Sequence, residues 1–263
     1  MNRKEIVFSV LLAVLFVFGV SGASYAIGIE AALGAWGQSP SGDFSYQSTS
    51  SVDRLDLEDD LGYESENKLM GRVKIDMPAV IPNIYIIGTP MSFDDDGSKS
   101  VDFTFGDKTF DVTADFSSKL EIDQYDIALY YSIPFMQTAT LDTLNLELGL
   151  NAKIIDFKAE IKGTESGSGL PVTETASETI PVPMIYVGIQ LNPTEKLAIE
   201  GELRGIAYSS SHYYDLIGRV KYSPFGPLFV AAGYRYEDIK IDVDDIKAKI
   251  KFSGPFAEVG VEF

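Results

Sequence analysis

Residues 254–263 read GPFAEVGVEF, and apolar and polar side chains alternate along this stretch. A period of two puts successive side chains on opposite faces of a β-strand. One face would carry Ala257, Val259, Val261 and Phe263, and the other Phe256, Glu258, Gly260 and Glu262. Strands of a transmembrane β-barrel need this pattern, because lipid contacts the apolar face and the lumen contacts the polar face. The stretch therefore predicts the closing strand of a membrane barrel.

The amino-terminal residues predict export. Arg3-Lys4 is followed by an apolar run over residues 6–20 and by the small-residue motif Ser24-Tyr25-Ala26. This order is typical of a secretory signal peptide, here residues 1–26, with a second possible cut after Ala23. A membrane anchor is the alternative, but the run has about fifteen residues and a spanning helix needs about twenty.

Composition excludes several classes of function. The net charge of −18 argues against a nucleic-acid partner, since phosphate binding needs a basic surface. The chain has no cysteine, so it can form neither disulfides nor thiolate sites, and its single histidine, His212, excludes a His-rich metal centre. We expect no cofactor and no dedicated metal site. Abundant glycine, tyrosine and phenylalanine suit strands with aromatic girdles.

Alternating segments recur along residues 27–263, which we predict to form one all-β domain. The predicted strands are residues 27–37, 69–77, 83–93, 125–133, 144–161, 183–191, 197–208, 214–222, 228–241 and 254–263. Short turns near residues 80, 137, 194 and 225 alternate with connections near 50, 105, 168, 210 and 244, of which the first three are long. Strict alternation of short and long connections is typical of an antiparallel up-and-down transmembrane barrel.

The strand count leaves alternatives open. Ten strands fit best, and eight or twelve remain possible because strand ends are blurred in sequence. A soluble β-sandwich would not need a uniformly apolar outward face on every strand. Within residues 144–161 the alternation slips by one at Ile154-Ile155, which predicts either a bulge or an extension of the strand above the membrane.

Eight segments carry a resemblance to known proteins: IGIEAALGAWGQSPSGDFSY, VDRLDLEDDLGYESENK, FTFGDKTFDVTADF, QYDIALYY, IPVPMIYVGIQ, AYSSSHYYDLIGRVKYS, GYRYEDIKIDVDDI and FSGPFAEVGVEF. They resemble a family of small, functionally uncharacterised outer-membrane β-barrel proteins of Gram-negative bacteria. The resemblance covers nearly all of residues 27–263 and implies a fold and an outer-membrane location, but no activity, because it brings no catalytic or binding residues. A more remote likeness to barrels of the OmpW and OmpA type concerns architecture only.

Charged side chains recur on the inward face of the predicted strands, with acids and bases in near balance. They are Arg72, Lys74, Glu147, Glu200, Glu202, Arg204, Asp215, Arg219, Arg235 and Glu237, together with Glu30, Asp76, Asp126, Lys153, Lys221, Glu258 and Glu262. They could line a cation-preferring channel. A salt-bridged plug is favoured, because the interior of a small barrel is just wide enough for side chains. Trp36 shares the inward parity and could belong to such a plug.

Three acidic clusters fall outside the predicted strands or at their ends. They are Asp56 with Glu58, Asp59 and Asp60; Asp94 with Asp95 and Asp96; and Asp242 with Asp244 and Asp245. None has the spacing of a calcium-binding loop, and charge runs are usually solvated surface. Loosely bound divalent cations that bridge to lipopolysaccharide are a milder hypothesis, and we expect outer-membrane lipid and lipopolysaccharide to be the main partners.

One short segment contains the residue types of a hydrolase. Ser209, Ser210 and Ser211 precede His212, and Asp215 follows, in a predicted outward connection. A catalytic site needs these groups in hydrogen-bonded geometry, which adjacency in sequence does not supply. A hairpin turn is the simpler interpretation, so we predict that the protein is not an enzyme.

Three hypotheses about function follow. The first is a structural or surface-interaction barrel with a largely side-chain-filled polar lumen. The second is a narrow pore or conduit for small or apolar solutes. The third, with little weight, is a lipid or peptide hydrolase at the rim that uses His212.

The closing stretch also resembles the signal read by the barrel-assembly machinery, with Phe263, Val261 and Val259 as the recognised residues. Deleting Phe263 should therefore reduce insertion into the outer membrane and leave export intact. The measurement is the amount of heat-modifiable barrel in purified outer membranes. A normal amount of folded barrel without Phe263 would contradict an assembly role.

Overall fold

The computed structural model describes residues 27–47, 50–78, 80–111, 116–134, 140, 143–243 and 246–263. The predicted signal peptide, residues 1–26, lies outside this range. No helix in the described part is long and apolar enough to cross a membrane.

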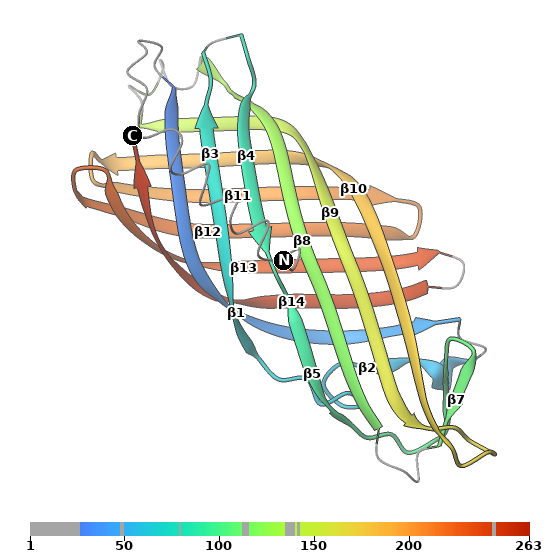
Figure 1. Cartoon of the computed structure of the whole chain (residues 1–263). Helices are drawn as coiled ribbons and strands as arrows, with labels where there is room; N and C mark the ends of the chain where they lie inside the picture. Colours follow the sequence, from blue (N-terminus) through green and yellow to red (C-terminus); the bar gives the residue numbers. More distant parts are fainter. Residues whose placement is uncertain are drawn as a thin grey trace.

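A closed antiparallel β-barrel forms the body of the protein (Figure 1). Each wall strand pairs with the next along the chain, and β14 pairs with β1 to close the barrel. The wall strands are β1 (Gly28–Tyr46), β3 (Glu66–Asp76), β4 (Asn83–Thr89) with its continuation β5 (Ser92–Gly97), β8 (Phe116–Ser132), β9 (Leu144–Thr164), β10 (Pro171–Thr194), β11 (Leu197–Tyr208), β12 (Ser211–Phe225), β13 (Leu228–Val243) and β14 (Ile246–Glu262). The predicted all-β barrel of ten strands is confirmed.

Strands β4 and β5 act as one wall strand. Both pair with β8 in a single register, from Asn83 opposite Tyr130 to Gly97 opposite Phe116. Pro90 interrupts the strand, since proline has no N–H to donate to a ladder. The Ile122 N–H still donates to the Met91 carbonyl at 2.9 Å across the break.

The outside of the barrel carries an exposed belt of apolar side chains. It includes Leu69, Ile127, Leu129, Leu148, Leu150, Ile185, Ile199, Leu216, Val220, Val230 and Val259. A soluble protein rarely exposes so large a continuous apolar surface, whereas a transmembrane barrel requires one. At the level of this belt, the wall thus presents its apolar side chains outward and its charged side chains inward.

The predicted slip at Ile154-Ile155 is not a bulge. Strand β9 pairs with β8 and β10 in unbroken register along its whole length. Beyond Ile154 the outward side chains become charged, as at Lys158, while inward positions such as Ile161 become apolar. The polarity of the two faces is therefore exchanged beyond Ile154. Of the two predicted explanations, the extension of the strand beyond the apolar belt accounts for this pattern.

The wall strands are longer than predicted, and the expected long loops are correspondingly shorter. Strand β1 continues to Tyr46, β8 begins at Phe116 and β10 begins at Pro171. These extensions were missed because their polar residues face outward above the apolar belt, where a membrane barrel was expected to have loops. We call the half of the barrel that contains these extensions the distal half. The other half is the terminal half, and its outer limit, which carries Gly28 and Phe263, is the terminal end.

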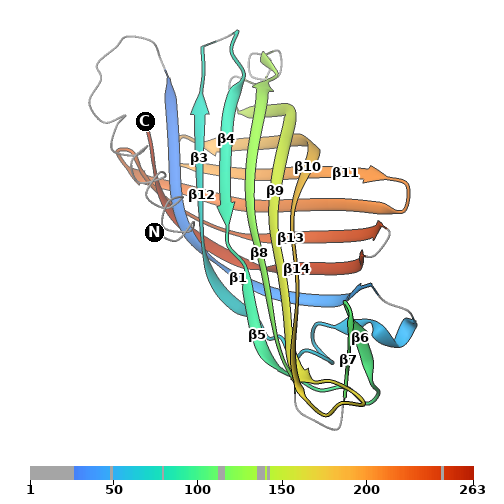
Figure 2. The same ribbon diagram turned by 45° about the vertical axis from the view of Figure 1, so that its right-hand side comes forward.

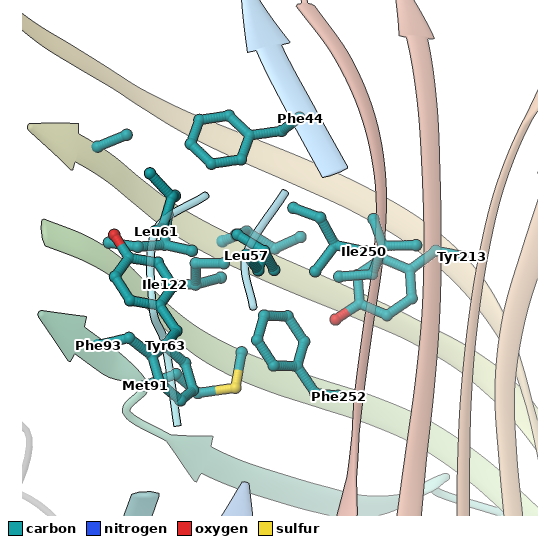
Figure 3. Packing of buried hydrophobic residues seen from close by; sticks show 14 of the residues in the cluster. Phe44, Leu57, Leu61, Tyr63, Met91, Phe93, Ile122, Tyr213, Ile250 and Phe252 are labelled. Atoms are coloured by element: carbon teal, nitrogen blue, oxygen red, sulfur yellow. The ribbon is translucent and has the colours of Figure 1, made fainter. Parts of the chain in front are cut away.

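The distal half is filled by an apolar core. Short segments enter the barrel between its walls: η2 (Ser51–Asp53), β2 (Leu55–Asp56), and residues 57–63. In Figure 3, Leu57, Leu61 and Tyr63 lie among side chains from the wall, including Phe93 and Phe252. The Phe93 and Phe252 rings stack with centroids 5.7 Å apart. Burial raises the pKa of Tyr63 to about 12, so this phenol remains neutral within the core.

A small hairpin completes the core. Strands β6 (Phe103–Phe105) and β7 (Lys108–Phe110) form a separate two-stranded sheet beside the distal ends of the wall strands (Figure 2). The Gly106 N–H donates to the Tyr46 carbonyl at 3.1 Å, and the Asp111 N–H to the Thr164 carbonyl at 2.9 Å. The hairpin thus joins β1 to the end of β9, and its phenylalanine side chains are buried in the core.

Because β1 and β14 lie in close contact at Gly254, we expect a larger side chain at this position to destabilise the barrel. Trp36 donates from its ring N–H to the Gly254 carbonyl at 3.2 Å, and a Cβ on Gly254 would collide with the Gly37 carbonyl. Gly254→Val should lower the free energy of unfolding by about 1–3 kcal/mol, because overpacking forces the backbone apart. The measurement is the urea midpoint of the protein in lipid vesicles, read from gel mobility without heating. Gly218→Val is the control, since nothing lies within 4 Å of its Cβ position, and an equal loss there would contradict this account.

Candidate functional site

The lumen of the terminal half collects the charged residues that the sequence predicts to face inward. Nine of the ten principal charges are buried, and Lys74 is half-buried. They come from β3, β9, β11, β12 and β13, so the barrel brings together residues far apart in the chain. The additional inward charges Glu30, Asp126, Lys153, Lys221 and Glu258 are buried with them, whereas Asp76 and Glu262, near the terminal end, are exposed.

Arg72 and Arg219 organise a charge layer near the terminal end. The Arg72 guanidinium donates to Glu258 through Nε at 3.0 Å and Nη2 at 2.8 Å, and it also pairs with Glu30. Arg219 pairs with Glu202 and lies 3.4 Å from Glu258. Bidentate arginine–carboxylate pairs fix geometry as well as charge. This layer therefore ties β3, β12 and β14 together through the lumen.

Lysine side chains complete the same layer. The Lys221 ammonium lies 2.7 Å from Glu30 and 3.3 Å from Glu200, and the Lys74 ammonium lies 3.2 Å from Glu147. The Glu147 carboxylate also accepts a 2.5 Å hydrogen bond from the Tyr186 hydroxyl. The pair between Lys74 and Glu147 links β3 to β9, which are not neighbours in the wall.

A second charge layer lies in the middle of the barrel around Lys153. Its ammonium lies 3.0 Å from Asp126, 3.1 Å from Asp215 and 3.7 Å from Glu237. Arg235 shares two of these carboxylates, pairing with Asp215 at 2.8 Å and Glu237 at 2.6 Å. Both cationic side chains have no solvent exposure. Such charges persist in a protein interior only when they are paired and hydrogen-bonded.

Aromatic rings fill the space between the charges. The Arg235 guanidinium lies 4.8 Å from the Trp36 ring centroid, and that of Arg204 lies 5.0 Å from Tyr85 and 5.2 Å from Tyr186. A cation over a ring face is stabilised by the ring quadrupole, most strongly where water is absent. Trp36 lies in the lumen, in keeping with its inward parity, whereas the lumen tyrosines were missed. Their inward parity was visible in the sequence, but tyrosine was attributed to the girdles.

The terminal end opens into a polar cavity of about 420 Å³. Glu30, Lys74 and Glu147 belong to its lining and also to the first charge layer. The cavity therefore reaches the salt bridges described above. A solute that entered it would meet paired charges and aromatic rings.

His212 does not assemble a hydrolytic site with its sequence neighbours. Its ring stacks on Tyr214 with centroids 5.0 Å apart, and its Nε2 lies 3.4 Å from Asp238. Asp215 is buried in the lumen with Lys153 and Arg235. Residues three apart in a strand lie on opposite faces, so this separation follows from the period of two. The Ser211 hydroxyl accepts a hydrogen bond from the Asp242 N–H at 3.1 Å.

The acidic clusters have structural settings. The Asp56 carboxylate accepts from the backbone N–H groups of Glu58 and Asp59, and the Asp60 carboxylate accepts from the N–H of Asp56. Lys99 pairs with Asp60 at 2.5 Å. Asp94, Asp95 and Asp96 belong to β5, where a loop had been expected. Among the described residues, no group of three or more potential ligands is placed to hold a metal ion. Asp244 and Asp245 lie outside the described residues.

The residues of the predicted assembly signal lie on the outer face of β14. Val259 and Phe263 are exposed, and Val261 is half-exposed. The Phe263 N–H donates to the Ile29 carbonyl at 2.9 Å, and the Ile29 N–H donates back to the Phe263 carbonyl at 3.1 Å. Backbone pairing at Phe263 thus contributes to closure of the barrel.

Comparison with solved structures agrees with the fold. The translocator domain of the autotransporter NalP from Neisseria meningitidis matches with a TM-score of 0.50 and 12% identity, over 98% of this chain and 95% of that chain. Ail of Yersinia pestis matches at 0.34 and 12% identity over 91% and 100%, and the Pseudomonas putida toluene transporter TodX at 0.32 and 9% over 91% and 90%. No protein-family model and no curated protein matches the sequence. The match to the NalP translocator domain and the closed antiparallel barrel itself show that the chain has the fold of outer-membrane β-barrels.

The Lys153 cluster gives a direct test of the middle charge layer. Lys153→Met should lower the free energy of unfolding by about 3–5 kcal/mol, because it leaves buried carboxylates without their cation. Urea unfolding in lipid vesicles measures the loss. Lys158→Met is the matched control on the outer face of the same strand, where a substitution should change stability by about 0.5 kcal/mol or less. Equal behaviour of the two variants would show that Lys153 does not hold the layer together.

Proposed function

We propose that the protein is a non-conducting outer-membrane barrel with a structural or surface-interaction role. The observation that carries this proposal is the stack of side-chain layers along the lumen: one charge layer near the terminal end, a second in the middle of the barrel and an apolar core in the distal half. Ion passage would require breaking buried salt bridges and then crossing packed phenylalanine side chains.

The proposed orientation places the terminal end in the periplasm and the distal half outside the cell. The apolar belt would lie in lipid, and the charged outer face above it would meet water and the headgroups of lipopolysaccharide. Charged side chains such as Lys158 and Glu160 support this arrangement, because they lie on the outside of β9 beyond the belt. The predicted signal peptide and the barrel-assembly machinery would bring the chain to this location.

The proposed role makes the distal half the working surface. It is built on long, continuous strands rather than on loops, since β9 and β10 pair from Pro171 opposite Thr164 down to Leu191 opposite Leu144. Rigid strands hold surface side chains in fixed positions, which suits recognition of a partner or of neighbouring lipid. Divalent cations held loosely between the acidic clusters and lipopolysaccharide would act at the same surface.

The competing hypothesis is a narrow pore, and single-channel recording separates the two. The purified protein in planar bilayers should show no steady openings, because its lumen is filled. The double variant Glu202→Ala with Arg219→Ala removes both partners of one pair, keeps the charge balance and should admit small conductance steps. Steady openings of the unmodified protein would overturn the closed-barrel proposal.

A second experiment separates the same hypotheses through stability. Glu200→Gln with Glu202→Gln removes two lumen charges that contact Arg219 and Lys221. In a filled lumen the change should lower the urea midpoint and leave conductance absent. In a pore it would instead alter the ion selectivity of existing openings, measured as the reversal potential in a salt gradient.

A further inference from the structure

The wall of the distal half has a notch between β10 and β13, where the shorter strands β11 and β12 end. Pairing between β10 and β11 stops at Ile185 opposite Gly205, although β10 continues to Pro171. Pro181 and Pro183 explain the stop. Both lie in an unbroken ladder with β9, so their nitrogen atoms, which carry no hydrogen, must face the β11 side.

A short hairpin forms the base of the notch. Strands β11 and β12 join directly, with Tyr208 opposite Ser211, and Ser209 adopts the left-handed backbone conformation at φ 55°. The turn of this hairpin lies a few residues before Tyr214, an aromatic residue on the outer face of β12, and is therefore slightly more distal than Tyr214. Aromatic side chains of this kind favour the membrane interface. The base of the notch therefore lies near the level of the outer lipid headgroups.

An apolar cavity of about 520 Å³ lies against the hairpin. A volume of this size is typical of small-molecule sites, which are mostly apolar with a few polar groups that orient the ligand. Its apolar lining comes from β1, β9, β10, β11, β12 and β13: Tyr46, Ile155, Ile180, Val182, Ile206, Tyr208, Tyr213, Ile239 and Ile241.

The cavity is closed toward the terminal end. Tyr213 belongs to its lining, and the Tyr213 hydroxyl donates to Glu237 at 3.0 Å in the middle charge layer. The Lys153 ammonium lies 5.0 Å from the centroid of the same ring. A ligand in the cavity would thus rest on the charge layer and go no further.

Cationic chemistry lies at the edge of the cavity. Lys240 and His212 are part of the lining, and they are paired positions on β13 and β12. Glu178 of β10 adds one carboxylate to the lining, and His212 lies 3.4 Å from Asp238, which leaves Lys240 as the cation available to a ligand.

On its other side Lys240 lies opposite Lys249 of β14, and like charges directly opposite each other are destabilising. Asp238 and Asp242 occupy the neighbouring positions on the same face of β13. Within the described residues, Lys240 forms no ion pair.

We propose that this cavity binds one hydrocarbon chain of an amphiphile whose acidic headgroup lies beside Lys240. The chain would be supplied either by a free fatty acid or by an acidic lipid of the outer leaflet, since both present the same chemistry to the notch. The site is a blind pocket, so it does not depend on whether the barrel conducts ions.

The test measures the binding of dodecanoate to the full barrel in phosphatidylcholine nanodiscs by calorimetry. The unmodified protein and each variant are compared in discs of identical lipid composition. The unmodified protein should bind, and Ile206→Trp and Ile180→Asp should each weaken Kd at least tenfold by filling the cavity or charging its wall. Ser177→Asp, an exposed position on the outer face of β10, is the matched control and should leave Kd unchanged. Gel mobility without heating confirms that each variant is folded.

Two further arms identify the headgroup and the source of the chain. Lys240→Gln should weaken dodecanoate binding and leave dodecanol binding unchanged. Adding lipopolysaccharide to the discs should abolish dodecanoate binding if lipid chains fill the cavity, and should leave it unchanged if the ligand is free in solution. Equal affinity of the unmodified protein, Ile206→Trp and Ile180→Asp would overturn the proposal, as would the absence of dodecanoate binding in discs without lipopolysaccharide.

Discussion

The structure depends on the need to satisfy every charge that the wall strands turn inward. A lumen this narrow offers little water, so each buried carboxylate must find a cation on another strand, and each cation must find its carboxylates. Lys153 illustrates the constraint, because one ammonium group serves Asp126, Asp215 and Glu237 from three strands. The pairing also fixes the register of the wall, since a slip of one residue in any strand would turn its charges toward the apolar belt.

The barrel has two halves with opposite polarity. In the terminal half the outside is apolar and the inside is charged, whereas in the distal half the outside is charged and the inside is apolar. The same strands run through both halves without a break in register, as β9 does on either side of Ile154. The solvent outside each half explains the difference, because lipid selects apolar side chains and water selects polar ones. In each half, the side chains that fill the lumen have the opposite polarity to those on the outer face.

Much of this could be predicted from the period of two. Inward and outward parity placed Arg72, Glu147 and Arg235 in the lumen, and the alternating segments indicated an antiparallel barrel of ten strands. The distal extensions could not be recognised with the same rule, because the rule assumed an apolar outer face. The pairing of Lys74 with Glu147 could not be predicted either, since nothing local in the sequence indicates which inward residues meet across a lumen. The notch depends on Pro181 and Pro183. The predicted strand began at Pro183 and left Pro181 out, and neither proline was interpreted as the end of the ladder with the neighbouring strand.

The exchange of polarity has a consequence for insertion. A preformed barrel that entered the bilayer from the periplasmic side would have to carry the charged outer face of its distal half, including Lys158 and Glu160, through hydrocarbon. Each lysine or arginine costs about 2–4 kcal/mol at the bilayer midplane, and each acidic side chain costs less. With the proposed orientation, we therefore expect the distal segments to cross through a passage shielded from lipid and to pack around their phenylalanine core afterwards. The same barrier favours an order in which the distal half is translocated before the apolar belt is released into lipid.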